Sequence, residues 1–299
     1  MKLQMGNAYL EMGSKYLTTL RDSNDILGDF NRLSERLAED GYLLIRQFHN
    51  KENIQLARQA LVDRLNNQGK INTDYPLIDA IAKEDVKGSF FGGVPSDENQ
   101  DLAPFYELVT NEEVMDFFSH LLGEEALTLD YKWPRAVPPG GNTGAHYDIV
   151  YMGRGTKDLY TMWTPLGNVT YEQGPLAMLL GSQHFEKVKN SYGKMDVDRD
   201  HVETGWFSND PIELVDHFNG QWATTEFEAG DVIIFGMFMM HSSFNNDSDS
   251  FRMSADTRYQ AASEATDERW VGKNPKGHYA WGKEKDLITV EEARKTWGL

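Results

Sequence analysis

The chain has 299 residues, of which 40% are hydrophobic and 12% aromatic, so it can bury a substantial core and global disorder is excluded. With 29 Lys and Arg against 47 Asp and Glu, the net charge is −18, which disfavours nucleic acids and anionic membrane surfaces as partners. This balance leaves room for a small anionic substrate held by one local Arg or Lys. The absence of Cys excludes thiolate nucleophiles, disulfides and Cys-ligated metals.

The sequence shows no apolar segment long enough for targeting or membrane insertion. The longest apolar run, Val232 to Met240, has nine residues, whereas a membrane span needs about 20. The first residues lack the apolar stretch of a signal peptide. Together with the absence of Cys, these features predict a cytoplasmic protein without a membrane partner.

In the N-terminal part, apolar residues recur at helical spacing in three segments. The predicted helices span residues 25–40, 53–65 and 111–122. A short strand is expected over 42–48, and residues 69–104 are rich in loop-forming residues.

From about residue 126 the pattern changes to short β-rich runs between clusters of Gly, Pro, Asn and Asp, as is typical of a sandwich or barrel. The predicted strands are Leu127–Trp133, His146–Met152, Leu159–Pro165, Leu176–Leu180, Trp222–Phe227, Asp231–His241 and Phe251–Ala261. Because no repeat or linker interrupts the chain, we expect a single domain over 1–299. It would comprise an N-terminal helical region of about 1–125, a β core of about 126–262 and a C-terminal tail of 263–299.

Three of the eight histidines are followed by an acidic residue two positions later. On a strand, residues i and i+2 lie on one face, so His-x-Asp/Glu can offer an imidazole and a carboxylate to one metal ion. His146 and Asp148 have the strongest context, because they follow a Pro- and Gly-rich turn and open a predicted strand. His184 and His201 lie in loop-like or charge-rich sequence, where a solvated side chain is the simpler interpretation.

His241 is the candidate for a third metal ligand. It ends the apolar run that follows Gly230-Asp231, which places an imidazole at the edge of a core. Taken alone, such a His is better explained by hydrogen bonds at the end of a buried strand. Together with His146 and Asp148, it completes two imidazoles and one carboxylate, the facial triad of non-haem Fe(II) oxygenases.

Two arginines, Arg252 and Arg258, lie in the β run that follows His241 after a short polar turn, so we expect this run to form a hairpin with the His241 strand. A buried guanidinium needs an anionic partner, and its planar fork suits a carboxylate. That partner is either the internal Asp256 or a ligand. The periodicity does not decide which of the two arginines meets a ligand.

Several short motifs follow one another along the chain. They are Leu37–Ile45, Pro138-Pro139-Gly140 before His146-Tyr147-Asp148, Trp163–Gly167, Gln173–Leu176 with Gly181-Ser182, and Gly230-Asp231 through His241 with Arg252 eleven residues further on. In this order, over roughly residues 27–261, they resemble the phytanoyl-CoA dioxygenase (PhyH-like) family of Fe(II)/2-oxoglutarate-dependent oxygenases. The ordered set is much more specific than any one motif.

This resemblance implies a mainly β fold with flanking helices, whose core is a double-stranded β-helix, that is, a cupin-like jelly roll. It implies His146, Asp148 and His241 as Fe(II) ligands and Arg252 as the residue that binds the far carboxylate of 2-oxoglutarate. Positions that line this cosubstrate fall on Ser243, Trp163 and Trp133. The implied activity is that of a dioxygenase that uses O2 and 2-oxoglutarate to hydroxylate or otherwise oxidise an unactivated C–H bond of a small molecule, releasing succinate and CO2.

Two other functions remain open from the sequence alone: a redox-inert metal-dependent isomerase or hydrolase on a similar barrel, and a non-catalytic jelly-roll binding protein. No catalytic residue beyond the metal site is expected. Lys87 lies where the family has a Lys that reaches 2-oxoglutarate, although a solvated loop Lys is the simpler interpretation. The aromatic-rich segments 185–226 and 263–299 are expected to roof the substrate site, and packing onto the barrel exterior is the alternative.

Overall fold

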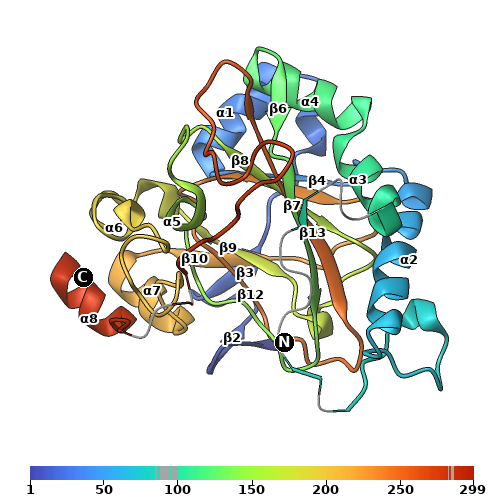
Figure 1. Ribbon diagram of the computed structural model, residues 1–299. Coiled ribbons are helices and arrows are strands. Elements are labelled where there is room, and N and C mark those ends of the chain that lie inside the picture. The colour runs from blue at the N-terminus through green and yellow to red at the C-terminus, as the bar shows by residue number, and fades with distance from the viewer. Residues whose placement is uncertain (85, 88–93, 96–99, 282, 284–285) are drawn as a thin grey trace.

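The computed structural model describes residues 1–84, 86–87, 94–95, 100–281, 283 and 286–299. Two β-sheets form the centre of the molecule and make the double-stranded β-helix implied by the resemblance (Figure 1). The described part of the larger sheet has the strand order β4 (Tyr42–Ile45), β11 (Val232–Gly236), β8 (Tyr160–Pro165), β13 (Arg252–Ala261), β7 (Tyr131–Val137) and β5 (Val94–Pro95), with β6 (Ala126–Thr128) also paired to β13. Neighbouring strands in it are antiparallel.

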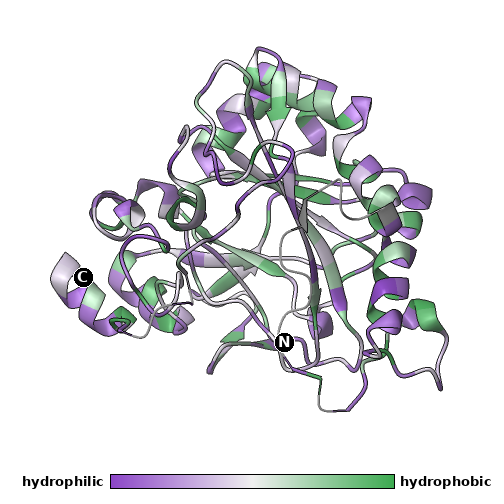
Figure 2. Ribbon diagram, in the orientation of Figure 1, coloured by the Kyte–Doolittle hydropathy of each residue, from purple (hydrophilic) through white to green (hydrophobic). Residues whose placement is uncertain are grey.

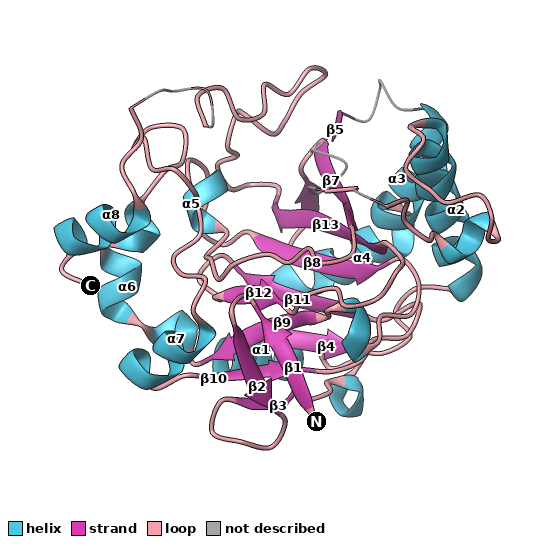
Figure 3. Ribbon diagram, turned by 90° about the horizontal axis from the view of Figure 1, so that it is seen from below, coloured by secondary structure: helices cyan, strands magenta, loops and turns pink. Residues whose placement is uncertain are grey.

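The smaller sheet supplies the opposite wall of the barrel. Its strands are β12 (His241–Ser243), β9 (Leu176–Leu180), β10 (Gln221–Thr224) and β3 (Leu17–Thr19), with β3 parallel to β10. A separate N-terminal hairpin consists of β1 (Lys2–Met5) and β2 (Ala8–Glu11). The view in Figure 3 shows the strands of both sheets gathered in the middle of the molecule with helices at two sides.

Strand β11 shows why the sequence here is apolar without alternation. Ile233 and Phe235 pack between the two sheets with Trp163, whereas Val232 and Ile234 pack on the opposite face against helices. Because both faces are buried, every position favours an apolar side chain. Hydrophobic residues accordingly concentrate on the central strands, as Figure 2 shows, while the outer helices mix both kinds.

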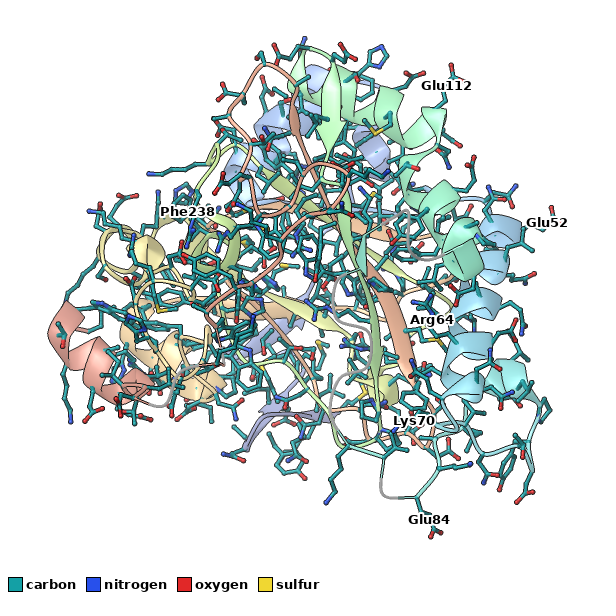
Figure 4. All side chains as sticks on the ribbon, in the orientation of Figure 1. Glu52, Arg64, Lys70, Glu84, Glu112 and Phe238 are labelled. Atoms are coloured by element: carbon teal, nitrogen blue, oxygen red, sulfur yellow. The ribbon has the colours of Figure 1, made fainter. Side chains whose placement is uncertain are left out.

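Among the described residues, four helices cover the outer face of the larger sheet, and the others gather near the C-terminus (Figure 1). The covering helices are α1 (Phe30–Asp40), α2 (Lys51–Asn67), α3 (Ala103–Thr110) and α4 (Glu112–Leu122). Those on the other side are α5 (Ile149–Met152), α6 (Glu186–Asn190), α7 (Pro211–Phe218) and α8 (Val290–Trp297). Short 3-10 turns span 24–26, 77–79, 100–102, 171–173, 182–184 and 192–194. Figure 4 shows Glu52 and Glu112 directed outward from α2 and α4, as expected for solvated helix faces.

The predicted helices are confirmed as α1, α2 and α4, and Asn111 and Gly123 cap α4 at its two ends. Elements β1–β3 and α3 have no predicted counterpart, so the region before residue 126 is not only helical. No helix in the described ranges is long and apolar enough to cross a membrane.

Three predictions about the β core are wrong. The run 231–241 is not one strand, because β11 ends at Gly236 and the chain turns into β12 of the other sheet. The expected hairpin between the His241 and Arg252 strands does not form, since β12 pairs with β9 and β13 pairs with β6, β7 and β8. Residues 146–152 are not a strand either, because α5 begins directly after Asp148.

Candidate active site

His146 and His241 come together through the backbone at the point where the two sheets approach. Each backbone N–H donates to the carbonyl of the other residue, at 3.0 and 3.1 Å, and the ring centroids are 4.1 Å apart. Asp148 follows as the N-terminal flanking residue of α5, with its side chain free of any cap. Ligand atoms of the three buried residues lie within 4.8 Å of one another.

The imidazoles are fixed in one orientation. The Nδ1 atoms of His146 and His241 lie 2.8 Å from the Gly144 carbonyl and 3.0 Å from the Met239 carbonyl, and a carbonyl can only accept, so each Nδ1–H donates. Both Nε2 lone pairs therefore face Asp148, whose Oδ1 is 3.6 and 3.7 Å away. Burial lowers the pKa of His241 to about 4, which keeps this imidazole neutral and able to bind a metal.

The two carboxylate oxygens of Asp148 have different neighbours. Oδ2 accepts hydrogen bonds from Thr161 Oγ1 at 2.5 Å and from Arg258 Nη2 at 2.9 Å. Burial acts to raise the pKa of this carboxyl, but Arg258 and the two histidines together lower it well below its usual range. Asp148 is thus an anion whose Oδ1 is turned towards the two Nε2 atoms.

The residues predicted to line the cosubstrate lie on strands around this cluster. Trp163 packs edge-on against Phe227 between the sheets, and Ser243 Oγ accepts the Thr143 N–H at 2.9 Å. Trp133 lies on β7 beneath the guanidinium of Arg258, 4.5 Å from its ring centroid.

The two arginines of β13 have different environments. Arg258 is an internal ion-pair partner of Asp148 and so belongs to the support of the metal cluster. Arg252 is 4% exposed, donates through Nη1 to the Gly174 carbonyl at 2.8 Å, and has a buried Nε without a partner. Burial lowers the pKa of Arg252 to about 10. Its environment is that of a desolvated cation whose hydrogen-bonding capacity is only partly used.

Arg135 is a polar residue of this interior that lies outside the sequence motifs. Its Nε lies 2.9 Å from Asp256 Oδ2. The sequence contains a pattern that indicates its position. Trp133 ends a predicted strand, and if that strand continues, Arg135 and Val137 lie on the same face as Trp133.

Aromatic residues from distant segments cover the His146 side of the cluster. The Tyr151 ring lies 5.5 Å edge-on from His146, and Trp281 of the tail packs on Tyr151 at 5.3 Å. Trp206, from the first aromatic-rich segment, lies directly against Gly144. Other aromatics of the two segments are core residues, because Phe207, Trp222 and Trp270 are fully buried. His184, His201 and Lys87 are exposed, and none belongs to the His146–Asp148–His241 cluster.

The sequence profile of the phytanoyl-CoA dioxygenase (PhyH) family matches residues 37–254. The chain belongs to this family. It is 27% identical over 259 residues to 1-deoxypentalenic acid 11-beta-hydroxylase of Streptomyces exfoliatus, covering 81% of this chain and 85% of that relative. Among solved structures it is similar to EctD from S. alaskensis, with a TM-score of 0.58, 17% identity and 91% of each chain covered. It is also similar to the non-heme alpha ketoglutarate dependent carbocyclase SnoK from nogalamycin biosynthesis, with a TM-score of 0.57, 19% identity, and 90% of this chain and 98% of that chain covered.

As a member of the phytanoyl-CoA dioxygenase family, the protein is an oxidoreductase, a non-haem Fe(II)- and 2-oxoglutarate-dependent dioxygenase. The isomerase, hydrolase and binding-protein interpretations are not favoured. The two solved relatives share the double-stranded β-helix with this chain. At 19% and 17% identity, the likeness to these two structures supports the fold alone.

Proposed function

We propose that the protein hydroxylates an unactivated C–H bond of a small molecule, with Fe(II) bound by His146, Asp148 and His241 and 2-oxoglutarate anchored by Arg252. The observation that carries the proposal is the orientation of the three ligand side chains. Two Nε2 atoms and one Oδ1 face a common point, while both Nδ1 atoms and Oδ2 are already hydrogen-bonded. Three ligands on one side of a metal leave positions for a cosubstrate and O2.

The donor set suits Fe(II), because two imidazoles and one carboxylate form the facial triad of non-haem iron oxygenases. Bound there with 2-oxoglutarate, the iron would activate O2 for C–H oxidation with release of succinate and CO2. The protein's own residues would hold the ligands in place, since Thr161 and Arg258 fix Asp148 and backbone carbonyls fix both imidazoles.

Arg252 is the proposed anchor of 2-oxoglutarate, with Ser243, Trp163 and Trp133 as lining residues. A carboxylate would satisfy the buried Nε that lacks a partner and would restore the interactions that this guanidinium loses on burial. The chemistry of the site therefore calls for an anion beside Arg252.

The first test is anaerobic Fe(II) binding by the purified protein and its variants. Wild-type protein should bind one Fe(II), and Ala substitution of His146, Asp148 or His241 should abolish this, whereas His184→Ala, an exposed control, should not. Fe(II) binding by His146→Ala at wild-type stoichiometry would refute the ligand assignment. The activity itself is tested by succinate formation that requires Fe(II), O2 and 2-oxoglutarate together.

The second test concerns Arg252. Arg252→Gln should retain Fe(II) but weaken 2-oxoglutarate binding by about tenfold to a hundredfold or more, because a charge-assisted hydrogen-bond pair is lost in a desolvated site. Arg58→Gln, on the helix-covered side, is the control, since Arg58 donates to the Ile78 and Leu166 carbonyls. Unchanged 2-oxoglutarate affinity in Arg252→Gln would assign the cosubstrate to another residue.

We also propose that residues 1–299 act as one oxygenase domain and that the enzyme works in the cytoplasm. Support for the first is the matched span of 37–254, which includes all proposed ligands. Support for the second is the absence of Cys, which fits a reducing compartment.

A further inference from the structure

Arg135 lies on the interior face of the larger sheet. In β7, Ala136 packs with the apolar cluster beneath α2 and α3, so its neighbour Arg135 points to the opposite face, into the barrel. On the adjacent β13, Met253 and Ala255 belong to that same outer cluster, which places Asp256 on the interior face as well. The 2.9 Å bond between Arg135 Nε and Asp256 Oδ2 agrees with both assignments.

The guanidinium of Arg135 is held on one side and open on the other. Asp256 engages Nε, and no residue in the described part of the chain hydrogen-bonds to the two Nη groups. The side chain is 37% exposed, although it lies on an interior face, whereas the side chain of Arg258 is 4% exposed. Solvent therefore reaches part of this side chain, and its two Nη groups form the planar edge that suits a carboxylate.

The charges of the interior call for one more anion than the cosubstrate provides. Three guanidiniums, of Arg135, Arg252 and Arg258, face two carboxylates, of Asp148 and Asp256, on this surface of the described strands. Fe(II) and the 2-oxoglutarate dianion would cancel each other and leave the interior with an excess of one positive charge. An unmatched charge in a largely desolvated space is costly, so a second anionic ligand would be stabilised there.

The pairing on β13 places Arg135 near the three candidate ligands. Asp256, which holds Arg135, and Arg258, which donates to Asp148 Oδ2, lie two positions apart on the interior face of this strand. Arg135 therefore lies close to the ion pair that fixes Asp148.

Half-buried aromatic side chains lie beside Arg135. Tyr131 shares its face of β7, and Trp281 packs on Tyr151 at 5.3 Å. Trp133 and Trp270 are buried core rings that pack against Tyr131 at 5.0 and 5.1 Å and support it. The half-buried rings suit an apolar body, whereas the guanidinium suits one planar anion.

We propose that Arg135 is the substrate-binding residue that selects a molecule with an apolar body and a carboxylate, with Asp256 positioning the guanidinium. This inference rests on the proposed function. Accessibility separates the two anions: the buried Arg252 takes the cosubstrate, and the solvent-reached Arg135 takes the substrate that enters afterwards. The C–H bond to be oxidised would then lie between the iron and the end of the substrate that is not held.

The test uses matched pairs of probes, namely a set of aliphatic, alicyclic and aromatic monocarboxylates and their primary amides. Binding is measured by tryptophan fluorescence and by calorimetry on protein loaded with Mn(II) and 2-oxoglutarate, which avoids turnover. In wild-type protein at least one carboxylate should bind about tenfold to a hundredfold more tightly than its amide, as expected for a hydrogen bond to a charged group. Arg135→Gln should abolish that preference, and Arg135→Lys should restore part of it.

Arg46→Gln is the matched control, because Arg46 also pairs with a buried Asp at 2.6 Å and is 29% exposed, but lies outside the barrel interior. This variant should keep the carboxylate preference. The proposal is overturned if no carboxylate binds wild-type protein better than its amide, if the preference survives in Arg135→Gln, or if Arg135→Gln weakens 2-oxoglutarate instead. Failure of wild-type protein to bind 2-oxoglutarate at all would refute the proposed function rather than this role of Arg135.

Discussion

At the scale of single residues, the metal cluster depends on how one carboxylate is held. Asp148 turns Oδ1 to the imidazoles because Thr161 and Arg258 occupy Oδ2. Such outer partners fix both the charge and the orientation of a ligand, and their loss typically weakens metal binding without removing any ligand. Arg258 is consequently part of the site's support and is unsuitable as a neutral control for Arg252.

We predict that Thr161→Val weakens Fe(II) binding by about tenfold to a hundredfold, because it removes the hydroxyl donor to Asp148 without changing the side chain's shape. Titration of the metal-free protein with Fe(II) measures this. Thr164→Val is the matched control on the same strand, since the Thr164 hydroxyl is buried without a hydrogen-bond partner. If both variants bind Fe(II) equally well, the Thr161 hydrogen bond does not support the metal.

His49 predicts how stability responds to acid. This side chain is 6% exposed, its Nε2 has no partner, and burial lowers its pKa from 6.5 to about 4. Between pH 6.5 and pH 4, His49 is protonated in the unfolded chain but stays neutral in the folded protein. The free energy of unfolding therefore holds its full value above pH 6.5 and falls as the pH drops towards 4. The total loss from His49 is about 3 kcal/mol.

His49→Leu should flatten this part of the pH profile. Urea unfolding of both proteins between pH 7 and pH 4 gives the free energy of unfolding at each pH. The wild type should lose more stability over this interval than the variant. Parallel profiles would contradict a neutral, buried His49.

The sequence points to the three candidate metal ligands that the structure brings together, whereas it does not indicate their supporting partners. His146 and Asp148 are close in sequence, and His241 ends a recognisable apolar run. The partners of Asp148 come from β8 and β13, and only the strand register brings them to its second oxygen. Register depends on long-range pairing, which a single sequence does not reveal.

At the scale of elements, the prediction of one strand over residues 231–241 failed for a local reason. The apolar run is continuous because β11 is buried on both faces and the following turn is buried too, so apolarity does not mark where the strand ends. The short run 149–152 was equally ambiguous, since four apolar residues fit a helical turn as well as a strand. His146 and His241 lie just outside these two misassigned segments or at their ends, and their backbones hydrogen-bond to each other.

The turn before β9 contacts Arg252, the proposed anchor of 2-oxoglutarate. Gly174 has φ +70°, and a Cβ there would lie 2.3 Å from the Phe244 carbonyl oxygen. Its own carbonyl accepts the Arg252 Nη1 bond. We predict that Gly174→Ala lowers stability by about 2 kcal/mol or more and also weakens 2-oxoglutarate binding, because the turn must shift.

Gly181→Ala is the control that separates the cost of an unfavourable backbone conformation from a shift of the turn. Gly181 also has positive φ, +81°, but a Cβ there would meet nothing within 4 Å. Its substitution should therefore cost about 1 kcal/mol and leave 2-oxoglutarate affinity unchanged. Thermal unfolding and cosubstrate titration of the two variants provide the comparison, and equal cosubstrate affinities in both would break the proposed link between this turn and Arg252.

At the scale of the whole molecule, a buried ion network ties the C-terminal tail to the loop that carries Asp198. Asp198 accepts the backbone N–H groups of Tyr279, Ala280 and Trp281 with one oxygen and engages Arg269 and His278 with the other. Burial acts to raise the pKa of Asp198, but these donors outweigh it and hold the pKa far below its usual range. The carboxylate therefore fixes a tail loop whose Trp281 packs on Tyr151 beside the metal cluster.

The aromatic-rich segments hold rings in two kinds of environment, the buried core and the neighbourhood of His146. Trp270 is fully buried, so deleting the tail from that point would remove a core side chain and confuse folding with function. Trp281 and Tyr151 form a wall on the His146 side instead. Composition could indicate aromatic segments, but which ring anchors and which ring lines a pocket depends on contacts between residues more than 100 positions apart.

We predict that Asp198→Asn releases this wall without disturbing the cosubstrate. The amide cannot accept all the bonds that the carboxylate accepts, and breaking a buried charge network typically costs about 3–5 kcal/mol. The tail should become several times more sensitive to limited proteolysis, while Fe(II) and 2-oxoglutarate still bind. Succinate formation should then exceed substrate oxidation, because a substrate that is poorly enclosed is not held at the reacting centre.

Glu268→Gln is the control within the tail, since Glu268 and Lys276 form an exposed pair at 3.9 Å whose loss should change stability by no more than about 0.5 kcal/mol. A tail that is cleaved faster in Asp198→Asn while oxidation remains fully coupled would show that the segment only fastens the barrel and does not enclose the substrate.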